Sequence, residues 1–265
     1  MSPVTIGIIG IGVLLVVFLL GMPVGFAMAL VGFAGFCYLV TPEAGLSILA
    51  RDIFNILSSY SLTVIPMFIF MGAIAYSSGM SRRLYDAGYV IFGQRRGGLA
   101  IATIAACAGF AAMCGSTNAT AAAMGRVALP EMKRYKYDDS LATGCLAAAG
   151  SLGVMIPPST IFIVYGILTE QSIGKLFIAG VLPGLLLAVL FIAVVFIICM
   201  RNPNLAPVGE PTSMKEKIAG LTGMIEMLAL FVLVIGGLFL GLFSPTQAGA
   251  VGAAGALVIG LIRRQ

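Results

Sequence analysis

Gly-Ser-Thr-Asn-Ala-Thr, residues 115–120, is a polar hexapeptide between two stretches of small and aliphatic residues. Residues 99–114 precede it, and Ala-Ala-Ala-Met-Gly follows it at 121–125. Inside a lipid bilayer, each unpaired backbone group costs several kcal/mol unless protein or trapped water satisfies it. The position of this hexapeptide relative to the membrane therefore decides how the chain folds.

A second interruption lies in the apolar stretch 140–169. Gly-Ser-Leu-Gly at 150–153 is followed by Ile-Pro-Pro-Ser at 156–159. The stretch is too long for one straight crossing of a hydrocarbon core of about 30 Å, so we expect a broken helix. Prolines also free helical carbonyls in the preceding turn, and these carbonyls could ligate a cation. We expect the two interruptions to face each other and form an ion and substrate site; a simple proline kink is the alternative.

The composition indicates an all-α integral membrane protein. The 265 residues are 60% hydrophobic and 9% charged, whereas soluble domains carry roughly 25% charged residues. No nucleic-acid partner is expected from the net charge of +5, because the basic residues lie at the ends of the spans. The absence of His removes the commonest metal ligand and general base. The five Cys lie in apolar stretches without paired spacing, so no disulfide is predicted. Without His, a buried pair of acids or a nucleophile–base spacing, no enzyme is predicted.

We divide the chain into four regions. Residues 1–80 are predicted to be scaffold helices, and residues 81–96 an amphipathic arm helix at the interface, with a polar loop as the alternative. Residues 97–172 are the predicted transport region, with a re-entrant hairpin at 98–132 and a broken helix at 140–169. Residues 173–265 are predicted to hold a span, a cytoplasmic loop and the first two helices of a second repeat.

The individual spans follow from the apolar runs. The first apolar run lacks the basic residues that precede a cleaved signal, so it is predicted to be a membrane helix. A mixed segment, 41–60, is expected at the interface. Outside the transport region, spans are predicted at 5–20, 24–40, 61–76, 174–200, 223–243 and 248–262.

The basic residues predict the orientation. With the N-terminus outside, twelve of the fifteen Lys and Arg fall on one face. Only Arg51 and Lys175 lie opposite, and Arg126 lies within the hairpin. Because cytoplasmic loops carry the excess of Lys and Arg, we expect a periplasmic N-terminus.

As a re-entrant tip, the hexapeptide would bind ions. The return helix is expected to begin near residues 118–120, with Ser116, Thr117 or Asn118 as its N-cap. Its positive dipole end would favour an anion, and the hydroxyl, amide and carbonyl oxygens would suit a sodium ion. An outer loop is the alternative; Arg126 favours re-entry, because a full crossing would place it near the bilayer centre.

Acidic residues are absent from the middle of the spans, and Glu226 comes nearest. Proton-coupled carriers usually keep a carboxylate or His there. Neutral oxygens therefore favour sodium over protons as the coupling ion, and no organic cofactor is expected.

An internal echo suggests an inverted repeat. Met22-Pro23 introduces a helix rich in Gly and Ala, and Ser244-Pro245-Thr246 does the same. The two turns fall on opposite sides of the membrane, as an inverted repeat requires. Coincidence is the alternative, since such turns are common in membrane proteins.

Four segments of the chain together match the pattern of a known family. They are 110–125, 150–165, 244–248, and Ile65-Pro66-Met67-Phe68-Ile69 with Gly72. In this order they resemble the large membrane subunit of tripartite ATP-independent periplasmic (TRAP) transporters. The resemblance is to the N-terminal half to two-thirds of that subunit, which is substantially longer. Gln247 departs from the family, which usually has an acid there.

The resemblance implies an elevator-type carrier of the ion transporter superfamily kind in a bacterial inner membrane. It implies sodium-coupled symport of an organic acid, such as a dicarboxylate or a sialic acid. A small membrane subunit would brace the scaffold in the lipid bilayer, and a periplasmic binding protein would deliver the organic anion. Another sodium-coupled anion carrier without a binding protein, and a scaffold fragment unable to transport, remain alternatives.

The resemblance also assigns the site residue by residue. The sodium ligands would come from Ser116, Asn118, Ser151 and Pro157. The sodium and substrate site would comprise Gly115, Ser116, Thr117, Asn118, Ala119, Thr120, Gly150, Ser151, Gly153, Pro157, Pro158 and Ser159.

Overall fold

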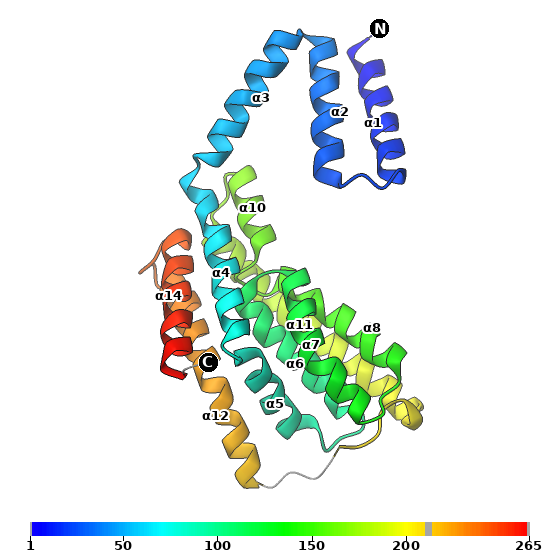
Figure 1. Cartoon of the computed structure of the whole chain (residues 1–265), viewed down its shortest axis with the longest axis vertical. Coiled ribbons are helices and arrows are strands. Elements are labelled where there is room, and N and C mark those ends of the chain that lie inside the picture. The colour runs from blue at the N-terminus through cyan, green and yellow to red at the C-terminus, as the bar shows by residue number, and fades with distance from the viewer. Residues whose placement is uncertain (1, 210–213, 264–265) are drawn as a thin grey trace. The chain divides into compact units, whose positions relative to one another are not determined.

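The computed structural model describes residues 2–209 and 214–263 (Figure 1). Every regular element in these ranges is a helix, and no strand occurs among them. The all-α prediction is therefore confirmed. The chain divides into two compact units, residues 1–59 and residues 60–265, which are described separately.

The first unit consists of three helices with mostly apolar surfaces. Helices α1 (Pro3–Leu19) and α2 (Val24–Leu39) are joined by a tight turn in which Gly21 has φ 82°. Most of their large apolar side chains are exposed, as expected for helices that face lipid. Helix α3 (Pro42–Leu57) is amphipathic, and the Thr41 hydroxyl caps it by accepting from the Ala44 N–H at 3.2 Å.

The second unit contains the remaining elements. A short 3₁₀ turn, Tyr60–Thr63, leads into α4. Near the end of the chain, a π turn at Val232–Gly236 separates α12 from α13. The helices are α4 (Val64–Ser77), α5 (Met80–Phe92), α6 (Gly98–Cys114), α7 (Thr117–Arg134), α8 (Asp139–Gly150), α9 (Leu152–Met155), α10 (Thr160–Leu168), α11 (Ile173–Arg201), α12 (Met214–Phe231), α13 (Gly237–Phe239) and α14 (Pro245–Arg263).

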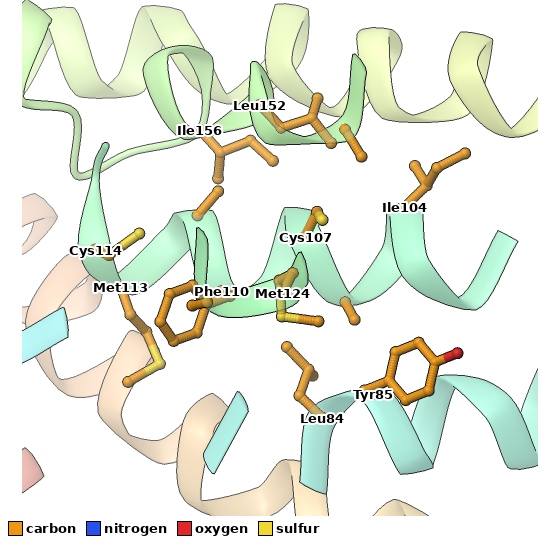
Figure 2. Packing of buried hydrophobic residues seen from close by; sticks show 14 of the residues in the cluster. Leu84, Tyr85, Ile104, Cys107, Phe110, Met113, Cys114, Met124, Leu152 and Ile156 are labelled. Atoms are coloured by element: carbon orange, nitrogen blue, oxygen red, sulfur yellow. The ribbon is translucent and has the colours of Figure 1, made fainter. Parts of the chain in front are cut away.

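Helix α6 forms the centre of the second unit. It contacts α4, α5, α7, α8 and α11, and most of its residues are buried (Figure 2). Its Ala- and Gly-rich sequence lets neighbouring backbones approach closely. At Gly72 of α4, an added Cβ would lie 2.6 Å from the Cβ of Cys114. A helix that is apolar all round is therefore accommodated because protein surrounds it.

Helix α5 corresponds to the predicted arm. It is a helix and not a polar loop, but it ends at Phe92, four residues before the predicted Arg96. Gly93 follows the helix directly, and Gly97, with φ 74°, is the residue before α6. Leu84, Tyr85 and neighbouring small residues are buried on one face. Its position at a membrane surface stays a prediction.

Within the described residues, five helical stretches are long and apolar enough to cross a membrane by length and composition. Helices α1, α2 and α6 are shorter apolar helices, and α7 meets neither description. The last predicted spans shift, because α12 already begins at Met214 and α14 at Pro245. Residues 210–213 of the predicted loop, and Arg264, lie outside the described residues. The five stretches are Tyr60–Ser77, Asp139–Leu168, Ile173–Arg201, Gly220–Phe239 and Pro245–Arg263.

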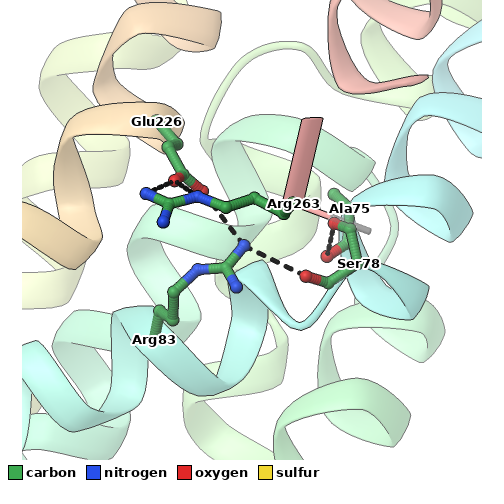
Figure 3. Close-up of polar contacts among 5 residues, drawn as sticks. All are labelled: Ala75, Ser78, Arg83, Glu226 and Arg263. Atoms are coloured by element: carbon green, nitrogen blue, oxygen red, sulfur yellow. Dashed lines mark hydrogen bonds and ion pairs between the residues drawn. The ribbon is translucent and has the colours of Figure 1, made fainter. Parts of the chain in front are cut away.

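An ion cluster joins three helices of the second unit (Figure 3). The Glu226 carboxylate of α12 lies 3.0 Å from Nη2 of Arg83 on α5. Its other oxygen pairs with Arg263 on α14. Arg83 also donates to the Ser78 carbonyl at 3.0 Å. Because Glu226 is only 13% exposed, its charge depends on these partners.

Candidate functional site

The hexapeptide is the tip of a helical hairpin. Helix α6 ends at Cys114, Gly115 closes it with φ 59°, and α7 begins at Thr117. Ser116 is extended and caps α7, since its Oγ accepts from the Ala119 N–H at 3.4 Å. Ser116 is therefore the N-cap among the three predicted residues, and the helix starts one residue before the expected range.

The second interruption is a true break. Helix α8 ends at Gly150, and the single turn α9 covers Leu152–Met155. The chain is then extended at Ile156 and at Ser159, and α10 starts at Thr160. The Ser159 Oγ caps α10 by accepting from the Phe162 N–H at 3.4 Å. The alternative of a simple kink is therefore wrong.

The two interruptions face each other. The N–H and the hydroxyl of Thr160 both donate to the carbonyl of Gly115, each at 3.0 Å. An added Cβ at Gly115 would overlap the carbonyl oxygen of Pro158, and one at Gly153 would lie 2.7 Å from the carbonyl of Ser116. The hairpin tip and the broken helix are thus in backbone contact that only glycine permits.

The predicted site residues differ in their exposure. Ser116, Thr117 and Ser151 are half-buried. Asn118 and Ala119, on the first turn of α7, are exposed. The buried members are Gly115, Thr120, Gly150, Gly153, Pro157, Pro158 and Ser159.

Most hydroxyl groups around the contact already have partners within the protein. Ser151 donates to the Ala148 carbonyl at 2.7 Å, and Thr120 lies 3.0 Å from the Cys114 sulfur. The Thr117 Oγ1 differs, because it is buried and has no hydrogen-bond partner among the described residues. A buried hydroxyl without a partner costs free energy, so the Thr117 hydroxyl is a candidate ligand for an ion at this contact.

The oxygen set fits a hard monovalent cation. No group of three His, Cys, Asp or Glu that could hold a metal occurs in the described part of the chain. The oxygens beside the contact are hydroxyls and carbonyls, which suit a dehydrated sodium ion. The fit centres on Thr117, whereas the exposed Asn118 amide lies at its margin. The sequence places Thr117 in the sodium and substrate site but not among the four named sodium ligands, because its lack of a partner depends on the surrounding fold.

A groove of about 310 Å³ opens beside the hairpin tip. Arg126 is its charged residue, and Nη1 donates to the Tyr76 hydroxyl at 3.4 Å, with the guanidinium 5.9 Å from the ring centre. Among the described residues, Arg126 forms no ion pair. Its charge is thus available to an anion. The groove is lined by Ile69, Gly72, Ala73, Tyr76, Phe110, Cys114, Ser116, Ala119, Ala122, Ala123 and Arg126.

From the sequence, Arg126 indicates the depth of the hairpin and is not predicted as a site residue. The residue carried a further signal, because it is the one charged side chain between Leu99 and Pro130. Charged residues in apolar surroundings commonly bind ligands. Thr160 was also missed, although it directly follows the predicted Ser159.

Comparison with known families decides the classification. Residues 11–265 match the family described as tripartite ATP-independent periplasmic transporter, DctM component. The chain belongs to this family. The resemblance stated from its motifs is therefore confirmed.

Individual relatives agree with membership of the DctM family. The C4-dicarboxylate TRAP transporter large permease protein DctM of Pseudomonas aeruginosa is 42% identical over 77% of this chain and 48% of its own length. The ectoine/5-hydroxyectoine TRAP transporter large permease protein UehC of Ruegeria pomeroyi is 36% identical over 93% of this chain and 57% of its own length. The sialic acid TRAP transporter large permease protein SiaM of Vibrio cholerae is 31% identical over 91% of this chain and 56% of its own length.

The DctM-family chain therefore spans about half the length of the curated relatives it matches. These relatives are permeases, so the prediction that the chain is no enzyme is confirmed. Together with the apolar helices, they indicate a multi-pass protein of the bacterial inner membrane.

Proposed function

We propose that this DctM-family chain forms part of a sodium-coupled transporter that imports an organic acid delivered by a periplasmic binding protein. The observation that carries the proposal is the backbone contact between the hairpin tip and the broken helix. This contact leaves the Thr117 hydroxyl buried without a partner, and it lies beside a groove that contains Arg126.

Sodium would bind at the contact of the two interruptions. The proposed ligands are Ser116, Asn118, Ser151 and the carbonyl of Pro157, and we add the Thr117 hydroxyl because it is buried without a hydrogen-bond partner. Ser116 and Ser151 use their hydroxyls in one hydrogen bond each, and a hydroxyl oxygen has two lone pairs. Neutral oxygens at broken helices are the usual ligands for coupling cations in carriers.

The organic anion would bind in the groove. The guanidinium of Arg126 offers paired N–H donors that match a carboxylate, and the N-terminus of α7 adds its positive dipole end. The names of two relatives specify C4-dicarboxylates and sialic acid, and both kinds of molecule carry carboxylates. We therefore propose a carboxylate substrate of this general kind.

The proposal includes the partners and the orientation. A small membrane subunit and a periplasmic binding protein would complete the transporter, and the N-terminus would be periplasmic. The ion cluster supports the assignment of the helix ends that carry Arg83, Glu226 and Arg263 to one common face, and the excess of basic residues makes that face the cytoplasmic one in this proposal. Elevator movement and the inverted repeat belong to the same proposal.

Thermal unfolding of the purified chain in NaCl and in KCl tests the sodium site. The wild type should gain stability in NaCl, because a ligand that binds the folded state stabilises it. Thr117→Val should be at least as stable as the wild type in KCl, since it removes an unpaired buried hydroxyl. Its sodium affinity should fall roughly 5- to 30-fold, as expected for about 1–2 kcal/mol of lost ligation.

The control variant is Thr143→Val, whose hydroxyl is exposed and bonds to the Asp139 carbonyl at 2.7 Å. It should keep the full sodium effect. An equal sodium response in Thr117→Val and the wild type would remove Thr117 from the site. Uptake into proteoliposomes that needs sodium but no binding protein would favour the alternative carrier, and no uptake with all partners present would favour the scaffold fragment.

A further inference from the structure

Arg126 borders two cavities and not one. On one side it lines the groove beside the hairpin tip. On the other side it lines a smaller cavity of about 180 Å³ between α5 and α7, whose further lining residues are Arg82, Asp86, Val127, Pro130 and Glu131. A long arginine side chain with several rotatable bonds can serve either cavity.

The smaller cavity holds two carboxylates from different helices. Asp86 comes from α5 and Glu131 from α7. Partial burial raises the pKa of the Asp86 carboxyl, Arg82 lowers it, and the negative charge of Glu131 raises it. Glu131 has a distant partner in Arg134 at 3.7 Å, and the Arg134 side chain is 72% exposed. The two acids are therefore only partly neutralised.

The smaller cavity brings these acids near Arg126, because Asp86 of α5 lines it together with Arg126 and Glu131 of α7. Arg126 and Glu131 lie on successive turns of α7. Pro130 lies between them inside α7. Its ring removes the N–H that would bond the Arg126 carbonyl, which loosens the helix at this turn. An unpaired guanidinium and two under-neutralised carboxylates thus share one cavity.

We propose that Asp86 and Glu131 are internal competitors for Arg126, which pairs either with the carboxylate of the bound anion in the groove or with these acids in the smaller cavity. This inference rests on the anion site of the proposed function. Internal pairing replaces the contact that the anion loses, so it weakens anion affinity and speeds release. Asp86 and Glu131 would then set the substrate affinity without touching the substrate in the groove.

Chemical labelling of Arg126 tests the pairing directly. The full chain is treated with phenylglyoxal, which modifies accessible arginines, and the adduct at Arg126 is quantified by peptide mass spectrometry. The double variant Asp86→Asn/Glu131→Gln should label Arg126 about two- to fivefold faster than the wild type, the range expected for loss of an exposed ion pair. The control Asp139→Asn removes one negative charge outside the cavity and should leave the rate unchanged.

Succinate then tests competition in the same assay. It should slow labelling of Arg126, and half-protection in the double variant should need about two- to fivefold less succinate than in the wild type. In proteoliposome uptake, the double variant should show a lower KM together with a lower maximal rate. A purely structural role for the acids would instead lower activity without lowering KM.

Two failures are distinguishable. Equal labelling rates in the double variant and the wild type would overturn the internal pairing, whatever succinate does. Faster labelling in the double variant without any protection by succinate would overturn the anion site of the proposed function, while the pairing of Arg126 with the acids would stand.

Discussion

Individual glycines determine how closely the two interruptions approach. Gly153 lies against the Ser116 carbonyl and the Thr117 nitrogen, and Gly115 adopts a left-handed conformation against Pro158. A side chain at either position would push the hairpin tip away from the broken helix. The site therefore depends on the lack of a Cβ at Gly115 and Gly153 as much as on its oxygen ligands.

Gly153→Ala should therefore damage the site. Its Cβ would lie 2.7 Å from the Ser116 carbonyl carbon and oxygen, so backbone atoms must shift, and we expect a loss of about 1–3 kcal/mol of stability. The sodium-dependent gain should also fall. Thermal unfolding with and without sodium measures both effects.

Gly144→Ala is the matched control. Gly144 lies in α8, and an added Cβ would meet nothing within 4 Å. Alanine favours helix over glycine by about 1 kcal/mol, so this variant should be equally or more stable. Equal behaviour of the two variants would show that the contact at Gly153 is dispensable.

The sequence predicted the residues of the two interruptions and their mutual contact. It did so because polar and Gly-Pro residues stand out in an apolar stretch. It did not predict which oxygen lacks a partner, since Thr117 differs from Ser116 and Thr120 only through its surroundings in the fold. Arg126 was noticed, yet its second cavity depends on Asp86, which is distant in sequence.

At the level of helices, the ion cluster fixes α5 against α12 and α14. Arg83 and Glu226 are 22% and 13% exposed, and their atoms lie 3.0 Å apart. Removal of Arg83 leaves the shielded Glu226 carboxylate with Arg263 as its remaining ion-pair partner in the cluster, and loss of one partner of a shielded pair destabilises a protein more than the pair itself stabilises it. The cluster thus couples the predicted arm helix to the last helices of the described chain.

A double-mutant cycle measures this coupling. We expect Arg83→Ala and Glu226→Ala each to lower the free energy of unfolding, with a coupling energy of about 1–3 kcal/mol. The control cycle uses Arg51 and Asp52, which lie 3.8 Å apart and are 70% and 56% exposed. Its coupling should be near zero, and a similar value for both cycles would contradict the structural role of the cluster.

The helices themselves were largely predictable, and their ends were less so. Long apolar runs gave the spans, because a membrane helix needs about 20 such residues. The end of α5 at Phe92 and the π turn at Val232–Gly236 were missed. Hydrophobic periodicity predicts that a helix exists, but it does not predict where the helix ends or where its hydrogen-bond pattern changes. The Arg83–Glu226 pair joins residues 143 positions apart, which no local pattern reveals.

At the level of the whole chain, hydrogen bonds join loops that the distribution of basic residues assigns to the same, cytoplasmic face. The Gly209 N–H donates to the Gly93 carbonyl, and the Asp138 N–H donates to the Leu205 carbonyl, both at 3.0 Å. The broken stretch Asp139–Leu168 then runs from this face to Thr169. The loops of the second unit are therefore predicted on two opposite sides of the membrane, and this assignment can be measured.

Cysteine labelling from each side of the membrane tests on which side each of these loops lies. The five native cysteines are first replaced, and single cysteines are introduced as Lys136→Cys, Asn204→Cys and Gln171→Cys. A membrane-impermeant maleimide should reach the first two from the cytoplasmic side and the third from the periplasmic side. Labelling of all three from one side would contradict both the broken helix as a span and the proposed orientation.

Thr160 gives the central contact a measurable signature. Its N–H and hydroxyl both end on the Gly115 carbonyl, so the hairpin tip and the start of α10 can separate only when this amide loses its acceptor. Hydrogen–deuterium exchange at Thr160 therefore reports the lifetime of the closed contact. The exchange rate of this single amide proton therefore measures how often the site opens, and the measurement needs no substrate, partner or membrane potential.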